Sequence, residues 1–381
     1  MDKPMDFKAR IAIVGGGILG LAHAYVLMRR GFRVTLFERS LQASGASIRN
    51  FGMIWPVGQP AGEMHSIAMR SREIWLEAVA HARLPFLDTG SLHVAYRDDE
   101  ADVLREFAEI GPPAGYPCAW LDRDGLLRRS KALNPEGLRG GIWSGTELTV
   151  DPRRIVAGMA DYLRSMGVEI HFGAAVRRID LPVIEAGARQ WTFDAAIVCS
   201  GDDFETLFPE IFASSGLTRC KLQMMRTAPQ PDGWRLGPAL AAGLTLRFYK
   251  SFQICSTLDR LRQRIAREMP EYDRWGIHIL ASQTADGAIT LGDSHEYGPI
   301  VDIFDKPQID DLILREAATF LRLPDPRIVE RWHGVYSLHP ALGFFEAEPA
   351  SGVRLITAPG GSGMTLSFGL AERTANRAGF R

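Results

Sequence analysis

A short glycine-containing segment near the N-terminus constrains the fold of this chain more than any other feature. Residues 10–16, RIAIVGG, form an apolar run typical of a strand that is buried on both faces of a parallel sheet. Residues 17–31 place apolar side chains at helical spacing, and Gly31 is suited to end that helix. Residues 32–39, FRVTLFER, indicate a second buried strand. The segment therefore predicts one βαβ unit.

The turn of this unit has the spacing Gly15-x-Gly17-x-x-Gly20. The first glycine permits a tight turn, the second lets a pyrophosphate approach the backbone, and the third lets helix and strand pack closely. The helix N-terminus offers unpaired N–H groups to the phosphates. Glu38, at the end of the second strand, is placed to accept hydrogen bonds from both ribose hydroxyls of an adenosine. A merely structural glycine turn does not account for Glu38, so we expect a dinucleotide, either NAD or FAD.

Length, charge and cysteine content limit the number of domains, the kinds of partner and the location that we expect. A chain of 381 residues that is 46% hydrophobic is long enough for two domains or one large composite. Its 44 basic and 45 acidic residues favour neither nucleic acid nor an anionic membrane as a partner. Four scattered cysteines form no CxxC pair, which indicates reduced thiols and a cytoplasmic location. We expect neither a signal peptide nor a transmembrane helix.

The rest of the chain predicts an α/β fold. Amphipathic helices are expected at 63–83, at 151–167 with Asp151 as N-cap and Pro152 in the first position, and at about 308–322. Residues 168–201 are strand-like, and alternating stretches between about 217 and 305, including LTLRFYKSFQIC at 244–255, favour an antiparallel sheet. Residues 352–361, GVRLITAPGG, predict another buried strand.

Three further stretches resemble FAD-dependent oxidoreductases of the D-amino-acid oxidase, glycine oxidase and sarcosine oxidase superfamily. They are FERSLQASGASIRNFGM (37–53), FDAAIVCSG (193–201) and LITAPGGSGMTLSFGLAE (355–372). The resemblance implies a Rossmann-like FAD-binding domain with a parallel sheet, discontinuous in sequence (1–85, 140–215 and 330–381), and a substrate domain with an antiparallel sheet (86–139 and 216–329). The cofactor would be FAD. Because no cysteine follows Cys255, we expect it to be non-covalent.

The resemblance also implies which residues bind FAD. Ser44 and Ser47 would face the pyrophosphate, and Val176 would hold the adenine through its backbone. The glycine loop at Gly361–Thr365 would give N–H groups to the flavin pyrimidine edge, where the helix N-terminus would stabilise negative charge on the reduced flavin. The predicted set is Gly15, Gly17, Ile18, Leu19, Gly20, Glu38, Arg39, Ser44, Ser47, Arg49, Asn50, Phe51, Val176, Ser200, Gly201, Gly361, Ser362, Gly363, Met364 and Thr365.

The substrate side is less constrained. In a strand, Arg247 and Tyr249 would share one face, and Phe248 and Lys250 would share the other. Only one of these two pairs can line a pocket for an anionic substrate, and each cation could equally be a solvated surface charge. Lys250 could also lie above the flavin to activate oxygen. Trp55 could be a pocket wall or a core residue.

Two histidines complete the candidate set. The segment LGDSHEYG places Asp293, His295, Glu296 and Tyr297 at a strand end, which suits an acid–base group or a polar turn. No histidine at ligand spacing supports a metal, so none is expected. His339 stands where relatives often carry an acidic residue. The predicted catalytic residues are Arg49, Lys250, His295 and His339, and the predicted substrate-binding residues are Trp55, Arg247, Tyr249, His295 and His339.

GASIRNFGMIWPVGQP (45–60) and GDSHEYG (292–298) look most like a bacterial subgroup of the superfamily associated with phosphonate catabolism. This resemblance implies oxidation of an aminoalkylphosphonate or its N-methyl derivative to phosphonoacetaldehyde and an amine. Hydride would pass to flavin N5, water would hydrolyse the imine, and oxygen would be reduced to peroxide. The alternatives are a glycine, sarcosine or D-amino-acid oxidase, a dehydrogenase of the same fold with another electron acceptor, a flavin-binding assembly or RNA-modification factor, and an NAD-dependent dehydrogenase.

Overall fold

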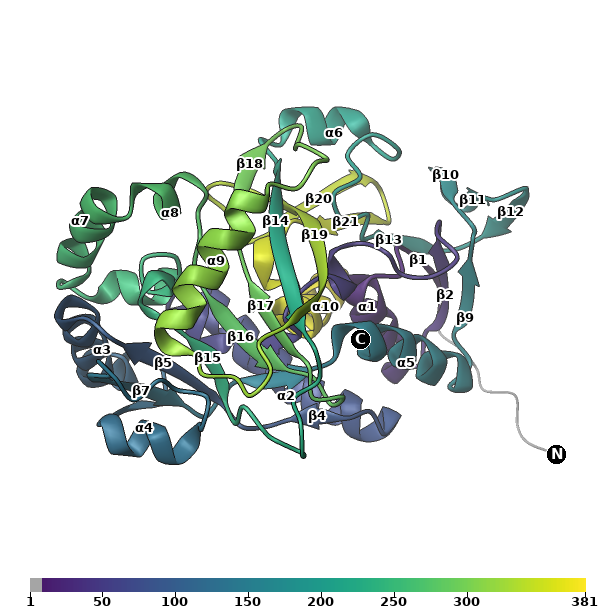
Figure 1. Ribbon diagram of the computed structural model, residues 1–381. Coiled ribbons are helices and arrows are strands. Elements are labelled where there is room, and N and C mark those ends of the chain that lie inside the picture. Colours follow the sequence, from purple (N-terminus) through teal and green to yellow (C-terminus); the bar gives the residue numbers. More distant parts are fainter. Residues whose placement is uncertain (1–8) are drawn as a thin grey trace.

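The computed structural model describes residues 9–381 and contains two large sheets (Figure 1). The first is six-stranded, in the order β20-β21-β13-β1-β2-β9, and is parallel except for β20. Its strands are β1 (Arg10–Val14), β2 (Arg33–Glu38), β9 (Glu169–Phe172), β13 (Ala195–Val198), β20 (Phe345–Ala350) and β21 (Val353–Thr357). The predicted βαβ unit is therefore confirmed, with α1 (Ile18–Arg29) between its two strands.

The second sheet is nine-stranded and mostly antiparallel, with β15 and β5 paired in parallel. Its order is β18-β14-β17-β16-β15-β5-β7-β6, and β19 pairs with β14. Its strands are β5 (Ser91–Ala95), β6 (Cys118–Leu121), β7 (Gly140–Ser144), β14 (Thr218–Thr227), β15 (Ala239–Ala241), β16 (Leu280–Gln283), β17 (Ile289–Gly292), β18 (Glu296–Gly298) and β19 (Ile328–Leu338). The fold is thus the predicted α/β class, with one parallel and one largely antiparallel sheet.

The described chain also contains two small three-stranded sheets. One contains β10 (Val176–Asp180), β11 (Val183–Ala186) and β12 (Arg189–Thr192), and the other contains β3 (Met53–Ile54), β8 (Leu148–Val150) and β4 (Phe86–Leu87). The second small sheet leads the chain from the parallel sheet into the mixed one, because β3 follows the βαβ unit and β4 precedes β5.

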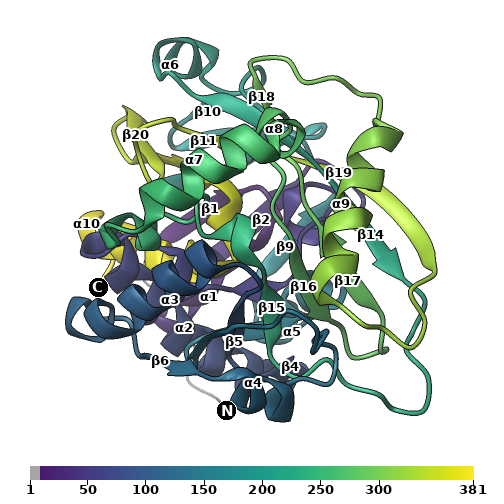
Figure 2. The same ribbon diagram turned by 60° about the vertical axis from the view of Figure 1, so that its left-hand side comes forward.

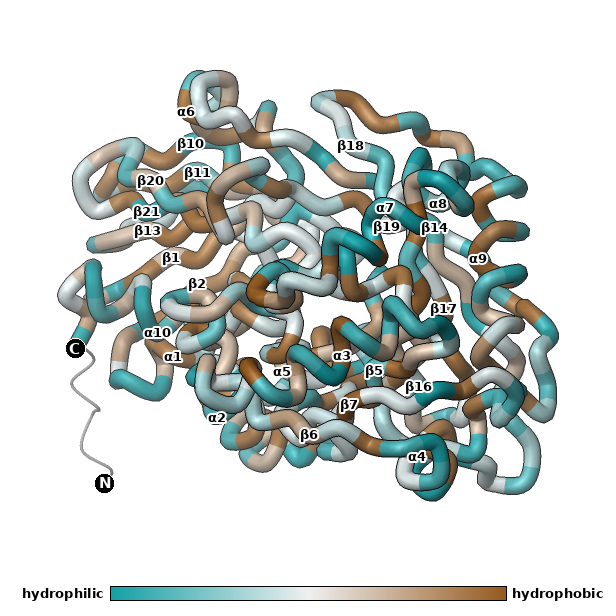
Figure 3. The backbone as a smooth tube through the Cα atoms, turned by 90° about the vertical axis from the view of Figure 1, so that its left-hand side faces the viewer, coloured by the Kyte–Doolittle hydropathy of each residue, from teal (hydrophilic) through white to brown (hydrophobic). Residues whose placement is uncertain are grey.

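Helices cover both large sheets. The helix α10 (Gly363–Arg377) contacts α1 and α2 (Glu63–Ala82), while α3 (Asp98–Ile110) packs on β5 and β7 and α9 (Pro307–Phe320) packs on β14 (Figure 2). The remaining helices are α4 (Arg123–Arg129), α5 (Pro152–Ser165), α6 (Pro209–Ser214), α7 (Leu258–Glu268) and α8 (Pro270–Arg274). The residues of β1 and β13 are mostly hydrophobic (Figure 3), and most of them are buried. Side chains from β1, α1, α2, α5 and α10 form one buried core.

Two sequence predictions need correction. Residues 244–255 do not form a strand: they contain the 3₁₀ turns Gly243–Thr245 and Lys250–Ile254. Their alternation of polar and apolar residues reflects a turn that is buried on one side. In addition, β7 and β19 belong to the mixed sheet, although the predicted domain division put residues 140–144 and 330–338 in the FAD-binding part. The predicted segment 1–85 also includes residues 1–8, which lie outside the described residues.

Within residues 9–381, no helix is both long and apolar enough to cross a membrane.

Candidate functional site

One cavity of about 710 Å³ extends from the parallel sheet to the mixed sheet. Such a volume is in the range of sites for cofactors and other small molecules. The cavity is lined by the turn after β1, by the segment from Phe37 to Pro60, by the end of β13, and by the loop that precedes α10. The predicted FAD-binding residues all line it, and so do the predicted substrate residues. Segments far apart in sequence thus share one site.

The glycine turn has the close contacts that its spacing predicts. Gly15 has a φ of +108°, and a Cβ there would lie 2.2 Å from the carbonyl oxygen of Cys199. A Cβ on Gly20 would lie 1.9 Å from the carbonyl oxygen of Gly15. A Cβ on Gly17 would meet only Ser47 Oγ, at 2.9 Å. The first and third glycines therefore serve packing, whereas Gly17 keeps open the space in front of α1.

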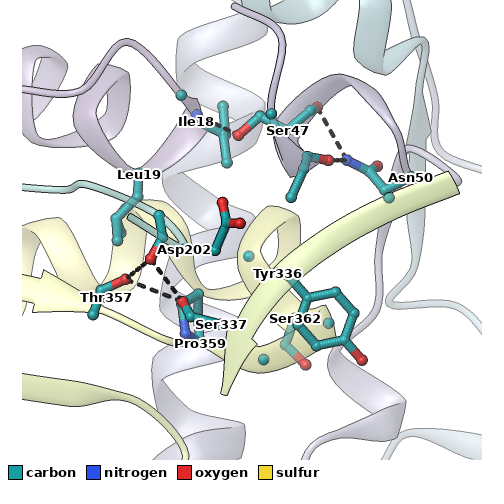
Figure 4. A pocket seen from close by; sticks show the side chains of 18 of the residues that line it. Ile18, Leu19, Ser47, Asn50, Asp202, Tyr336, Ser337, Thr357, Pro359 and Ser362 are labelled. Atoms are coloured by element: carbon teal, nitrogen blue, oxygen red, sulfur yellow. Dashed lines mark hydrogen bonds between the residues drawn. The ribbon is translucent and has the colours of Figure 1, made fainter. Parts of the chain in front are cut away.

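The N-terminus of α1 faces this space. Its N-cap, Gly17, provides no side-chain cap, and the N–H of Ile18 donates to Ser47 Oγ at 2.9 Å (Figure 4). The Ser47 hydroxyl is thereby fixed beside the helix terminus, where an anion is stabilised by the helix dipole.

Glu38 ends β2 with its carboxylate at the cavity wall. One oxygen accepts the N–H of Gly16 at 2.7 Å, and the other accepts the N–H of Ser40 at 2.8 Å. A carboxylate has about four acceptor positions, so two remain for ribose hydroxyls. The Arg39 side chain forms an ion pair with Asp203 at 2.6 Å and takes no part in the hydrogen bonds of Glu38.

The segment after Ser44 forms a fixed turn along the cavity. The side-chain nitrogen of Asn50 donates to the carbonyl oxygens of Ala46 and Ser47, and its oxygen accepts the N–H of Gly52. Asn50 therefore shapes the turn. Arg49 donates to the carbonyl oxygen of His333 at 3.2 Å.

The first turn of α10 and the loop before it are held by hydrogen bonds from the segment after β3 and from α2. The Trp55 N–H donates to Thr365 Oγ1 at 2.8 Å, and Gln59 Nε2 donates to Ser362 Oγ at 2.9 Å. Trp75 is completely buried, and its indole N–H donates to the carbonyl oxygen of Met364 at 2.7 Å. No side chain among the described residues caps α10, and its first residues, Gly363–Thr365, line the cavity.

Hydrogen bonds to the turn after β13 join the two large sheets at the cavity. The carbonyl oxygen of Gly201 accepts the hydroxyls of Ser337 on β19 and Thr357 on β21, at 2.9 and 2.7 Å (Figure 4). The neighbouring Ser200 has a buried hydroxyl with no hydrogen-bond partner among residues 9–381. Val176 begins β10 and is buried against the cavity.

These features fit FAD. The open space at Gly17, the two free acceptor positions of Glu38 and the unpartnered hydroxyl of Ser200 suit the adenosine and pyrophosphate parts. The uncapped terminus of α10 suits the flavin part. The cavity also joins both ends.

The predicted substrate cations differ in availability. The Arg247 guanidinium forms an ion pair with Asp273 at 3.0 Å and donates to the carbonyl oxygens of Leu244 and Ile277. With its donors so engaged, Arg247 stabilises the cavity wall and is poorly placed to bind an anion. Lys250 is exposed at the cavity edge. Tyr249 lines the cavity beside Trp55, with ring centroids 6.2 Å apart.

Sequence reasoning missed one residue that lines the cavity near Tyr249, namely His278. His278 precedes β16, and it exchanges backbone hydrogen bonds with Asp293 after β17. Its Nε2 lies 3.2 Å from Asp293 Oδ1, and His295 Nε2 lies 4.0 Å from Asp293 Oδ2. Together these three side chains form a buried group, which we call the Asp293 cluster. The sequence shows no histidine at ligand spacing from His295, but strand pairing brings the distant His278 across from Asp293.

Burial sets the charge of this cluster. It lowers the pKa of His295 to about 4 and that of His278 well below its ordinary value, so both imidazoles are neutral at neutral pH. Burial also raises the pKa of Asp293 well above its ordinary value. His295 is oriented by a hydrogen bond between its Nδ1 and the carbonyl oxygen of Gly276, at 2.9 Å.

His339 has a local structural contact. Its Nδ1 accepts the N–H groups of Ala341 and Leu342 at 3.0 and 2.9 Å, which fixes the turn after β19. His339 also lines the cavity. Its role in substrate binding stays a prediction.

The site can now be compared with known proteins. The sequence pattern of the family described as "DAO: FAD dependent oxidoreductase" matches residues 10–377. The chain belongs to this family. Its cofactor is accordingly FAD, as the sequence predicts, and NAD is excluded.

Two individual relatives share modest sequence identity with this chain, over less than half of its length. The chain is 26% identical over 171 residues to a glycine oxidase of Geobacillus kaustophilus, which covers 43% of this chain and 45% of that protein. It is 26% identical over 179 residues to a 4-methylaminobutanoate oxidase (formaldehyde-forming) of Paenarthrobacter nicotinovorans, covering 46% of this chain and 22% of that protein. Thus the chain spans less than half the length of these curated relatives.

The fold similarity covers nearly the whole chain. The crystal structure of glycine oxidase from Geobacillus kaustophilus superimposes with a TM-score of 0.77 at 18% identity, covering 98% of this chain and 96% of that one. At this identity the similarity establishes the fold.

Proposed function

We propose that this protein oxidises a small anionic amine, primary or secondary, with FAD as the hydride acceptor. The observation that carries the proposal is the continuity of one cavity from the glycine turn to the Asp293 cluster and Tyr249. A substrate there lies at the flavin end of the cofactor site, against a wall of aromatic rings and titratable groups. Relatives whose names include glycine oxidase and 4-methylaminobutanoate oxidase support an amine as the substrate class.

Bound FAD would supply the hydride-accepting chemistry, and the chain's own residues would bind and orient the amine. The backbone N–H groups at the start of α10 would favour negative charge on the reduced cofactor. The rings of Trp55 and Tyr249 would exclude water from the substrate, and water that enters after oxidation would hydrolyse the imine. Lys250, at the cavity edge, is the candidate for attracting the anionic group or promoting oxygen reduction.

We further propose that the anionic group is a phosphonate, so that the substrate is an aminoalkylphosphonate or its N-methyl derivative. The support is the resemblance of residues 45–60 and 292–298 to the phosphonate-associated subgroup. Electrons would pass to molecular oxygen. Four free cysteines are consistent with a cytoplasmic location.

Anaerobic bleaching of the flavin tests the substrate class. Glycine, sarcosine, D-amino acids and aminoethylphosphonate with and without an N-methyl group are compared at equal concentration. We expect the aminoethylphosphonates to bleach the flavin fastest. If only the carboxylates do so, the phosphonate proposal fails, and if no amine does so, the amine proposal fails. Aerobic turnover without peroxide would instead assign a dehydrogenase.

A further inference from the structure

The Asp293 cluster lies in the rigid part of the substrate wall. Asp293 and His278 occupy paired positions at the ends of β17 and β16, and the His295 N–H donates to the carbonyl oxygen of Trp275 at 2.7 Å. The three side chains are 2–7% exposed, and all of them line the cavity. Their positions are thus set by strand pairing, which suits a binding site that must be preorganised.

The carboxylate of this cluster lacks a cationic partner. Among residues 9–381, the ion-pair contacts of Asp293 are only those with the two imidazoles, and both are neutral at neutral pH. The 3.2 Å contact between Asp293 Oδ1 and His278 Nε2 lacks the geometry of a hydrogen bond, so within the described residues neither this oxygen nor either ring nitrogen of His278 has a hydrogen-bond partner. A buried carboxylate without a partner is costly, so a bound cation would stabilise the ionised site.

Aromatic rings pack against the two imidazoles of this cluster. The Phe248 ring lies 4.1 Å from that of His278 and 4.4 Å from that of His295, measured between centroids. Tyr249 lies 5.8 Å from His278. Ring faces beside a carboxylate suit an alkylated ammonium, whose charge is spread over apolar groups. A metal ion would use the ring nitrogens but not these ring faces, so the surroundings favour an organic cation.

We propose that the Asp293 cluster, with the ring faces of Phe248 and Tyr249, binds the protonated amino group of the substrate. This proposal rests on the proposed amine oxidation and deepens it, because it assigns opposite ends of the substrate to different parts of the cavity. The ammonium group lies at the Asp293 carboxylate, and the anionic group points away from it. One N–H of the ammonium donates to Asp293 Oδ1.

The test is equilibrium binding of tert-butylammonium to the FAD-loaded protein, followed by the change in flavin absorbance. This probe carries no hydrogen on the carbon next to nitrogen, so it cannot be oxidised there. Its uncharged analogue of similar shape, tert-butyl alcohol, is the reference. We expect the wild-type protein to bind the cation at least 10-fold more tightly than the alcohol, since a charge-assisted hydrogen bond is lost in the alcohol. Equal affinity for the two would overturn the proposal.

Variants locate the site. Asp293→Asn should weaken tert-butylammonium binding about 10- to 100-fold and leave the alcohol unchanged. Phe248→Leu should weaken cation binding about two- to fivefold through the lost ring face. Asp310→Asn is the matched control, because Asp310 is a buried carboxylate that does not line the cavity. Unchanged cation binding in Asp293→Asn would refute the site, as would a stoichiometric metal ion that is lost in the same variant.

The pH dependence provides a test in the wild-type protein. Because burial raises the pKa of Asp293, the carboxylate ionises only as the pH rises through that value. Cation binding should therefore tighten with pH up to this pKa and then level off, and Asp293→Asn should remove the dependence. The other titratable groups near Asp293 are His278, His295, Tyr249, Tyr297, Tyr336 and Cys220, and the charge of Arg247 acts on the two imidazoles. Burial lowers the pKa values of the imidazoles and raises those of the tyrosines and the cysteine. We therefore expect the increase in cation affinity with pH to follow the ionisation of Asp293.

Failure of this proposal differs from failure of the proposed function. If amines bleach the flavin but tert-butylammonium binds without dependence on Asp293, amine oxidation stands and the ammonium subsite is wrong. If tert-butylammonium binds as expected but no amine bleaches the flavin, the cation site stands and amine oxidation is wrong.

Discussion

Substitution of Gly20 by alanine should destabilise the protein, although alanine normally favours a helix. In an exposed helix interior, glycine to alanine gains about 1 kcal/mol. Here the new Cβ would lie 1.9 Å from the carbonyl oxygen of Gly15, whereas ordinary contacts are at 3.4 Å or more. The helix must therefore move by about 1.5 Å (3.4 − 1.9) from the turn. Overpacking of this kind costs about 1–3 kcal/mol, so we expect a net loss of free energy of unfolding.

The same movement should weaken FAD binding. It displaces the turn between Gly15 and Gly17 from the phosphate position at the start of α1. The loss of one charge-assisted hydrogen bond there, about 1.5–3 kcal/mol, raises the dissociation constant for FAD by about 10- to 100-fold. Urea unfolding of the apoprotein measures the first effect, and quenching of FAD fluorescence on titration measures the second.

Gly369→Ala is the matched control. Its Cβ would lie 2.2 Å from the carbonyl oxygen of Ile67, between α10 and α2, and Gly369 does not line the cavity. It should lower stability similarly without a comparable change in intrinsic FAD affinity. If Gly20→Ala is as stable as the wild type and binds FAD equally well, the close contact of helix and turn is not what requires glycine.

Further changes test other parts of the site. Gly17→Val should yield folded protein without yellow colour, because the side chain fills the space in front of α1; full FAD occupancy by absorbance would contradict this. Trp75→Phe should lower the free energy of unfolding by about 1–3 kcal/mol, because the carbonyl oxygen of Met364 loses its buried donor, and urea unfolding measures it. Acid precipitation should release free FAD into the supernatant, whereas yellow colour retained in the pellet would mean a covalent link.

Local signals in the sequence predicted much of the fold. The helix 152–165 begins where Asp151 and Pro152 predict, with Asp151 accepting the Arg153 N–H. Gly20 has the close contact that its spacing predicts, because its neighbour, the carbonyl of Gly15, belongs to the same turn. These two features depend on residues close in sequence, whereas the close contact of Gly15 is with Cys199, which follows a distant strand.

The substrate wall depends on contacts that the sequence does not encode locally. His278 meets Asp293 through antiparallel pairing, whose register is fixed only when β16 and β17 are aligned. Arg247 is engaged by Asp273, a partner brought near by a turn and two short helices. Alternation at 244–255 predicted a strand because burial on one side of a 3₁₀ turn produces a similar pattern.

The return of the chain to the parallel sheet has a consequence for protein synthesis. The turn at Gly15 leaves the ribosome well before the loop at 360–365, which lines the other end of the cavity. In a nascent chain the adenosine half of the site can form before the flavin half exists. Full cofactor capture must therefore follow synthesis of α10, and a chain truncated before Gly363 would lack the flavin half of its site. Yellow colour in a preparation of this protein would thus report that α10 has been made and docked.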